Sequence, residues 1–174
     1  MSTVLFTLPQ NFSYALAGAS CVVAVLHFSG LMLAYARSTT FSASNMENVK
    51  RELAATGAAE DADHIPSQAY PDDGNGRFGK ALDYYYWAKF NRVVRGYMNN
   101  HEQLVNFLVS ILLCAVYQPV WAAWIGLGIG VSRLVYFVGY AYINTIVMMI
   151  GEVPALLLMF ANYGIFLYYL ISGN

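Results

Sequence analysis

Charged residues are scarce in this sequence of 174 residues. They make up 11% of the chain, whereas 58% of it is hydrophobic. With 9 Lys and Arg against 10 Asp and Glu, the formal net charge is −1. The chain therefore lacks the basic excess with which nucleic-acid-binding proteins neutralise phosphates. Because a soluble domain of this size does not need so much apolar surface, the composition indicates a membrane protein.

Cysteine is also rare. The 2 cysteines, Cys21 and Cys114, each lie inside an apolar run, which excludes a disulfide framework and a cysteine zinc site. His and Glu residues do not recur at metal-ligand spacing either, so we predict no metal site. We interpret both cysteines as packing residues.

The sequence contains four long apolar runs. Residues 13–36 carry no formal charge, and as a helix they are long enough to cross the ~30 Å hydrocarbon core of a bilayer. Three more runs occupy 103–117, 119–142 and 153–172, and the first of these extends backwards along a helical pattern. We therefore predict an all-α membrane protein that forms a bundle of four transmembrane helices, in a single domain 1–174.

The cations are concentrated in one part of the chain. Eight of the 9 lie between residues 37 and 95. The positive-inside rule predicts that this segment faces the cytoplasm, or the matrix of a mitochondrion. With an even number of spans, both termini lie on the opposite side. We therefore predict a multi-pass protein that lies in the membrane of the endoplasmic reticulum or of a mitochondrion.

An extended polar loop, residues 38–83, separates the first two predicted spans. Within it, Ser44 and Glu47 form a capping-box pattern and Gly57 is placed as a helix stop. The apolar positions between them are Met46, Val49 and Leu53. We predict a short helix over 45–56. Its apolar stripe suits the bilayer surface, a partner or the rest of its own protein, and of these we favour its own protein.

Polar residues repeat at helical spacing on the second and third predicted spans. The second span carries Arg92, Arg95, Asn99 and Glu102, and the third carries Arg133, Tyr136 and Tyr140. Spacings of three and four residues place each set along one face of its helix. An arginine at membrane depth needs an acceptor, and Glu102 is the candidate by type.

These two stripes have two interpretations. In the first they form an internal polar clamp, in which Glu102 pairs with Arg133 or Arg95 and Asn99 bonds across helices. In the second they cradle a small zwitterionic or anionic ligand, with Arg binding carboxylates and Glu an amine. The sequence leaves both open, although two stripes instead of one favour a ligand site.

A pair of glycines, Gly126 and Gly130, forms a G-x-x-x-G pattern on the third span. Such small residues let two membrane helices approach closely. We predict a close helix contact there.

Three stretches of the sequence resemble a known family. They are Phe90–Glu102 (FNRVVRGYMNNHE), Tyr117-Gln-Pro, and Gly130–Tyr140 (GVSRLVYFVGY). The family is that of the membrane-associated proteins in eicosanoid and glutathione metabolism (MAPEG), and the likeness is greatest to the type-three microsomal glutathione transferases. It covers residues 14–37 and 70–142.

The resemblance implies a homotrimer of four-helix subunits, with glutathione bound between neighbouring subunits near the cytoplasmic side. It implies a membrane glutathione transferase or peroxidase, whose lipophilic electrophiles or lipid hydroperoxides enter from the lipid bilayer. The glutathione-binding residues that it implies are Arg37, Arg95, Asn99, Glu102, Arg133, Tyr136 and Tyr140.

One basic position of the family pattern is missing. Family enzymes stabilise the glutathione thiolate with an arginine or another polar donor shortly after the tyrosine that corresponds to Tyr140, because the thiol must ionise to attack. Residues 141–151 contain no cation, and Val147 stands where the leukotriene-synthase branch has its arginine. The alternative hypothesis is therefore a catalytically silent accessory or structural subunit of a larger membrane complex, and no catalytic residue is assigned.

Overall fold

The computed structural model describes residues 8–57, 69 and 72–173. All secondary structure in these residues is helical. The helices are α1 (Phe12–Thr40), α2 (Ala43–Ala55), α4 (Arg77–Lys80), α5 (Tyr84–Tyr117), α6 (Pro119–Tyr142) and α7 (Thr145–Ser172).

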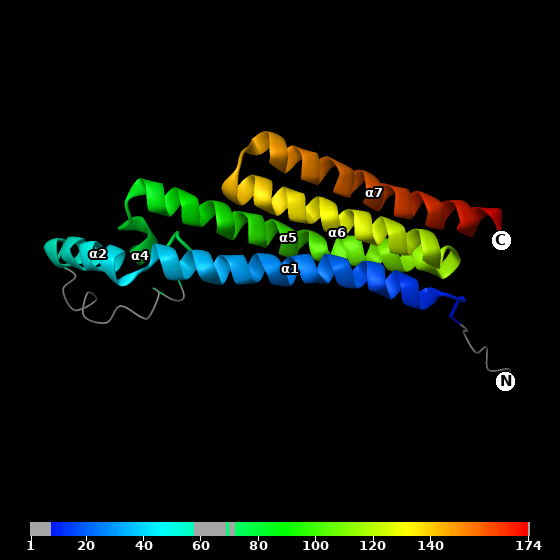
Figure 1. Ribbon diagram of the computed structural model, residues 1–174, viewed down its shortest axis with the longest axis horizontal. Coiled ribbons are helices and arrows are strands. Elements are labelled where there is room, and N and C mark those ends of the chain that lie inside the picture. The colour runs from blue at the N-terminus through cyan, green and yellow to red at the C-terminus, as the bar shows by residue number, and fades with distance from the viewer. Residues whose placement is uncertain (1–7, 58–68, 70–71, 174) are drawn as a thin grey trace.

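The four long helices α1, α5, α6 and α7 run side by side in alternating directions (Figure 1). Both α1 and α7 pack against α5 and against α6, which form the centre of the bundle. The start of α1 and the end of α7 lie at the same end of the bundle, and α2 and α4 lie at the other (Figure 1). The predicted four-helix bundle is confirmed.

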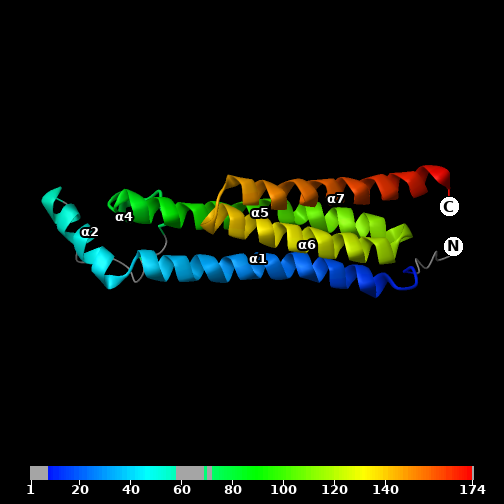
Figure 2. The same cartoon turned by 45° about the horizontal axis from the view of Figure 1, so that its top comes forward.

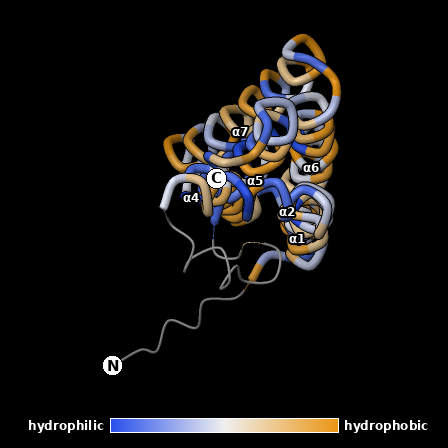
Figure 3. Tube along the Cα trace, turned by 90° about the vertical axis from the view of Figure 1, so that its left-hand side faces the viewer, coloured by the Kyte–Doolittle hydropathy of each residue, from blue (hydrophilic) through white to orange (hydrophobic). Residues whose placement is uncertain are grey.

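Three of the long helices, α1, α6 and α7, are each long and apolar enough to cross a membrane. In contrast, α5 is a single helix of 34 residues with a charged first half and an apolar second half. Much of the outer surface is apolar, with exposed side chains such as Trp124, Leu157 and Phe160. Seen from the α2 end, apolar residues cover the outer turns of α6 and α7 (Figure 3). This surface suits a lipid environment.

Local sequence signals explain where α6 and α7 begin. Pro119 occupies the first turn of α6, where its missing N–H costs nothing, and Gln118 before it is non-helical, with φ −133° and ψ 68°. The Asn144 side chain caps α7. Helix α7 begins ahead of the predicted apolar run 153–172. The added turns include Glu152, whose side chain is partly buried in the bundle.

The predicted short helix is present as α2, which turns away from the axis of α1 (Figure 2). Its N-cap is Ser42 instead of the predicted Ser44, and the Ser42 hydroxyl accepts from the backbone N–H of Asn45 at 3.5 Å. Gly57 follows the helix with φ 81°, as a glycine stop does. The apolar stripe of α2, Met46, Val49 and Leu53, is buried as predicted.

Glycines bring α1 and α6 into backbone contact. A Cβ added to Gly126 would lie 2.9 Å from the carbonyl carbon of Gly18, and one added to Gly130 would lie 3.2 Å from the Cβ of Cys21. The close helix contact predicted from the G-x-x-x-G pattern is confirmed.

Two apolar cores follow one another along the bundle. The core nearer the termini includes Ala15, Val22, Phe107, Ile111, Ile129 and Ala155. The core nearer α2 includes Ala36, Phe90, Val94, Tyr136 and Phe137. On α6, Arg133 lies between Ile129 and Phe137, and on α5, Asn99 and Asn100 lie between the two cores in the same way. The fold thus places a polar layer between two apolar ones.

Candidate functional site

Arg133 on α6 is the centre of a buried polar cluster that joins three helices. Only 2% of the residue is exposed. Its Nε donates to Asn100 Oδ1 at 2.9 Å and its Nη2 donates to Asn99 Oδ1 at 2.5 Å, both on α5. Its Nη1 donates to the carboxylate of Glu152 on α7. The cluster compensates the buried charge and links α5, α6 and α7 through one side chain.

Aromatic rings flank this guanidinium. Its Cζ lies 4.1 Å from the centroid of the Tyr136 ring and 5.6 Å from that of Phe107. Tyr136 in turn stacks on Tyr140, with the centroids 6.0 Å apart and the planes 17° apart. The third-span stripe predicted from the sequence is therefore a continuous contact of one cation and two phenol rings.

The prediction that Glu102 accepts from Arg133 is wrong. In the described part of the chain, the carboxylate paired with Arg133 is Glu152, whereas Glu102 is exposed. The predicted bond of Asn99 across helices is confirmed. The sequence did hold a signal for the correct pair, because Arg133 and Glu152 are the only charged residues after position 102.

Two predicted residues of α5, Arg95 and Glu102, are exposed. Within the described residues, neither makes a hydrogen bond or an ion pair. Glu102 lines a cavity of about 260 Å³ between α5 and α1. The other polar side chains of this cavity are Asp73, Tyr97 and His101. This face of α5 therefore offers a free guanidinium and a free carboxylate to a ligand or a neighbouring chain.

Arg37, at the end of α1, is bound to the segment that leads to α4. Its Nη1 donates to the backbone carbonyl of Asp72 at 2.6 Å and its Nη2 pairs with Asp73 Oδ1 at 2.8 Å. Its Cζ also lies 5.4 Å from the ring centroid of Phe90 on α5. Arg37 is thus buried and holds this segment against the bundle.

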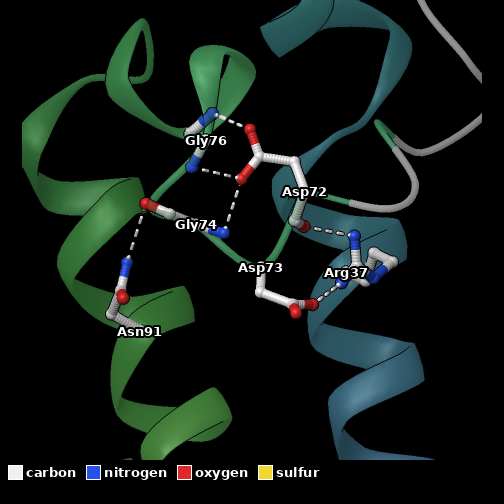
Figure 4. Close-up of polar contacts among 7 residues, drawn as sticks. Arg37, Asp72, Asp73, Gly74, Gly76 and Asn91 are labelled. Atoms are coloured by element: carbon white, nitrogen blue, oxygen red, sulfur yellow. Dashed lines mark hydrogen bonds and ion pairs between the residues drawn. The ribbon is translucent and has the colours of Figure 1, made fainter.

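The Asp72 carboxylate organises the same segment. It accepts from the backbone N–H groups of Gly74 at 2.7 Å, Gly76 at 2.9 Å and Gly79 at 2.8 Å (Figure 4). Gly74 has φ 89°, which favours glycine, and its carbonyl accepts from Trp87 Nε1 on α5 at 2.6 Å. The sequence indicated this segment only as a polar loop. In the structure it is ordered, and its contacts with Arg37 and Trp87 link the end of α1 to the start of α5.

The structure brings some of the predicted residues together and leaves others apart. Asn99 belongs to the α5 stripe and accepts from Arg133 of the α6 stripe, so the two stripes meet there. Asp73, which pairs with Arg37, lines the same cavity as Glu102. Arg95 has no hydrogen bond or ion pair to any of them in the described residues.

Two absences concern the chemistry of this site. Residues 141–151 are all described and contain no cation, and Val147 at the family's arginine position is half-buried at the start of α7. No group of three or more His, Cys, Asp or Glu residues in the described part of the chain is placed to hold a metal ion.

The sequence model of the MAPEG family matches residues 14–164, from the first turn of α1 into α7. The chain belongs to the MAPEG family. A search of curated proteins and a search of solved structures found no match. MAPEG membership identifies a membrane protein of a family concerned with glutathione-related transfer and eicosanoid metabolism. The likeness to its type-three branch stays a prediction.

The MAPEG match includes every residue predicted to bind glutathione, from Arg37 to Tyr140. MAPEG proteins generally use glutathione as a substrate or cofactor. Glutathione carries two carboxylates and one amine, and the exposed face of α5 carries groups of complementary charge at Arg95 and Glu102. The described residues thus fit such a ligand at this face.

Proposed function

We propose that this MAPEG chain is an integral membrane glutathione transferase or peroxidase that acts on lipophilic electrophiles or lipid hydroperoxides. The observation that supports this best is the meeting of the two polar stripes at Asn99, which accepts from Arg133 and lies between Arg95 and Glu102 along α5. In the proposed site, Arg95 binds a glutathione carboxylate and Glu102 binds its amine, as charge complementarity favours.

The other predicted residues have roles in the same site. Arg37 closes its α1 side together with Asp73, which shares a cavity with Glu102. Tyr136 and Tyr140 extend it along α6. Each of the three guanidinium nitrogens of Arg133 donates to a protein partner, so we assign it the positioning of Asn99.

The proposed assembly is a homotrimer with glutathione between subunits, as the family resemblance implies. The exposure of Arg95 and Glu102 supports this, because a neighbouring subunit has free access to that face of α5. Native mass spectrometry of the purified protein tests it: a trimer is expected, and a monomer that binds glutathione would contradict it.

Calorimetric titration of the full-length protein in detergent with glutathione tests the site. We expect binding by the wild type and a loss of about tenfold or more in affinity for Arg95→Gln, because a charge-assisted bond to a carboxylate is lost. Arg51→Gln, which removes an exposed arginine of α2, is the matched control and should bind normally. Equal affinity of the Arg95 variant and the wild type would refute the site.

The second candidate is a catalytically silent accessory or structural subunit of a larger membrane complex. It is favoured by the missing cation in residues 141–151 and by the bonds that all three guanidinium nitrogens of Arg133 make within the protein. Glutathione binding without thiolate absorbance, and without conjugation of a chloronitrobenzene, would support it against the enzyme.

Val147→Arg separates the two candidates further. If the enzyme lacks only the thiolate-stabilising donor, this variant is expected to raise the conjugation rate on the order of 10²-fold. Val147→Lys places a cation at the same position with a different geometry. Val147→Gln places a neutral side chain of similar length there and should not raise the conjugation rate. No gain with either cation would indicate that the chain is silent for another reason.

A further inference from the structure

A cavity outside the polar cluster lies between the first turns of α5 and the end of α6. It has a volume of about 590 Å³, and the residues that define it include Tyr84, Tyr85, Lys89, Arg92, Ala141 and Tyr142. None of these belongs to the glutathione site proposed above. The cavity is thus a separate feature of the same end of the bundle.

The charge of this cavity is positive and uncompensated. Lys89 and Arg92 are both exposed, lie one helical turn apart, and make no ion pair or hydrogen bond within the described residues. No carboxylate lines the cavity. The adjacent acid, Asp83, instead accepts from the backbone N–H of Tyr85 at the start of α5. An anion is therefore the complementary ligand.

The position of the cavity corresponds to a membrane boundary. Helix α6, one of the three candidate spans, ends at Tyr142, and α7 begins at Thr145. The first turns of α5 project past this α6–α7 turn towards α2 and α4 (Figure 1). Three tyrosines surround the cavity, with Tyr84 77%, Tyr85 65% and Tyr142 42% exposed. Amphipathic rings in this arrangement are typical of the headgroup level of a bilayer.

An apolar track leads from the cavity into the bundle's membrane zone. Counting back from Ala141 in helical steps along α6 gives Val138, Leu134 and Val131. Leu134 is 37% exposed and Val131 is 56% exposed. An acyl chain attached to a headgroup in the cavity can therefore pack along this apolar face of α6.

We propose that this cavity binds the phosphate headgroup of an anionic phospholipid. Lys89 and Arg92 bind the phosphate oxygens, the tyrosine hydroxyls surround the headgroup, and the acyl chains lie along α6. A freely soluble phosphate ester shares the headgroup chemistry but gains nothing from the apolar track, so the site is assigned to the lipid.

Native mass spectrometry of the full-length protein in an equimolar mixture of phosphatidylglycerol and phosphatidylcholine tests the site. We expect the wild type to retain phosphatidylglycerol in preference to phosphatidylcholine. In the double variant K89Q/R92Q this preference should fall about tenfold, because two cations near an anionic lipid are removed. Retention of the full preference by that variant would overturn the proposal.

Two controls make the result specific. K50Q/R51Q removes two exposed cations from α2, and an equal loss of preference in it would show general attraction to charge and overturn the site. K89R/R92K keeps both charges and should keep the preference, which separates charge from folding. An excess of soluble glycerophosphoglycerol should not displace the lipid, and displacement would assign the site to a free phosphate ester instead.

Discussion

Arg133 and Glu152 are the only charged residues after position 102, and the fold pairs them in the polar layer between its two cores. A charge in this environment is costly unless it is paired and hydrogen-bonded. The sequence correctly indicated that Arg133 needs an acceptor at membrane depth. It did not identify the acceptor, because Glu102 and Glu152 are of one chemical type and only the packing of α7 against α6 determines which one is near.

Removing one partner of this pair should destabilise the protein more than replacing both. We expect Glu152→Leu to lower the free energy of unfolding by about 3–5 kcal/mol, because an uncompensated buried charge remains. The double variant Arg133→Met with Glu152→Leu should recover a large part of that loss. Thermal unfolding in detergent measures both, and a double variant no more stable than Glu152→Leu would show that the pair does not act in this way.

At the scale of elements, apolar runs and stop signals predicted most helices. The glycine stop at Gly57 and the apolar stripe of α2 each act locally, so the sequence contains the information. The start of α7 and the ordered loop around Asp72 were harder to predict from the sequence. Glu152 interrupts an apolar run that the helix continues through, and the Asp72 bonds form only where the backbone of Gly74–Gly79 turns back on itself.

The contact between α1 and α6 should be sensitive to one added methyl group. A Cβ at Gly18 would lie 2.7 Å from the carbonyl oxygen of Ala123 and 2.9 Å from its Cα. Backbone atoms cannot move aside cheaply, so Gly18→Ala is expected to cost about 1–3 kcal/mol of stability. The measurement is the midpoint of thermal unfolding in detergent.

Gly164→Ala is the matched control for that substitution. Gly164 lies inside α7, and a Cβ there would meet nothing within 4 Å. Because alanine favours a helix interior by about 1 kcal/mol over glycine, this variant should unfold at the same temperature as the wild type or higher. Equal destabilisation of the two variants would argue against a specific α1–α6 contact.

At the scale of the whole molecule, the alternating directions of the four long helices place the start of α1 and the end of α7 at the same end of the bundle (Figure 1). Eight of the 9 cations lie between residues 37 and 95, towards the other side. The positive-inside rule therefore predicts that α2 and α4 face the cytoplasm or the matrix.

Cysteine labelling with a membrane-impermeant maleimide tests this orientation. In sealed vesicles with the cytoplasmic or matrix face outside, Lys50→Cys on α2 should react directly, whereas Ser172→Cys at the end of α7 should react only after permeabilisation. The natural cysteines, one buried and one half-buried, set the background in the wild type. Labelling of both variants from one side would contradict the topology, and the reverse pattern would contradict the orientation.

The sequence by itself determined the class of this protein: its membrane character, its helices, its two polar stripes and its family resemblance. Each of these depends on composition or on spacing along one helix, which the chain carries locally. Only the tertiary structure decided that Arg133 pairs with Glu152, that Asn99 joins the two stripes, and that Arg37 holds the Asp72 loop. Those contacts join residues from different helices, and distances between helices depend on how side chains and glycines pack.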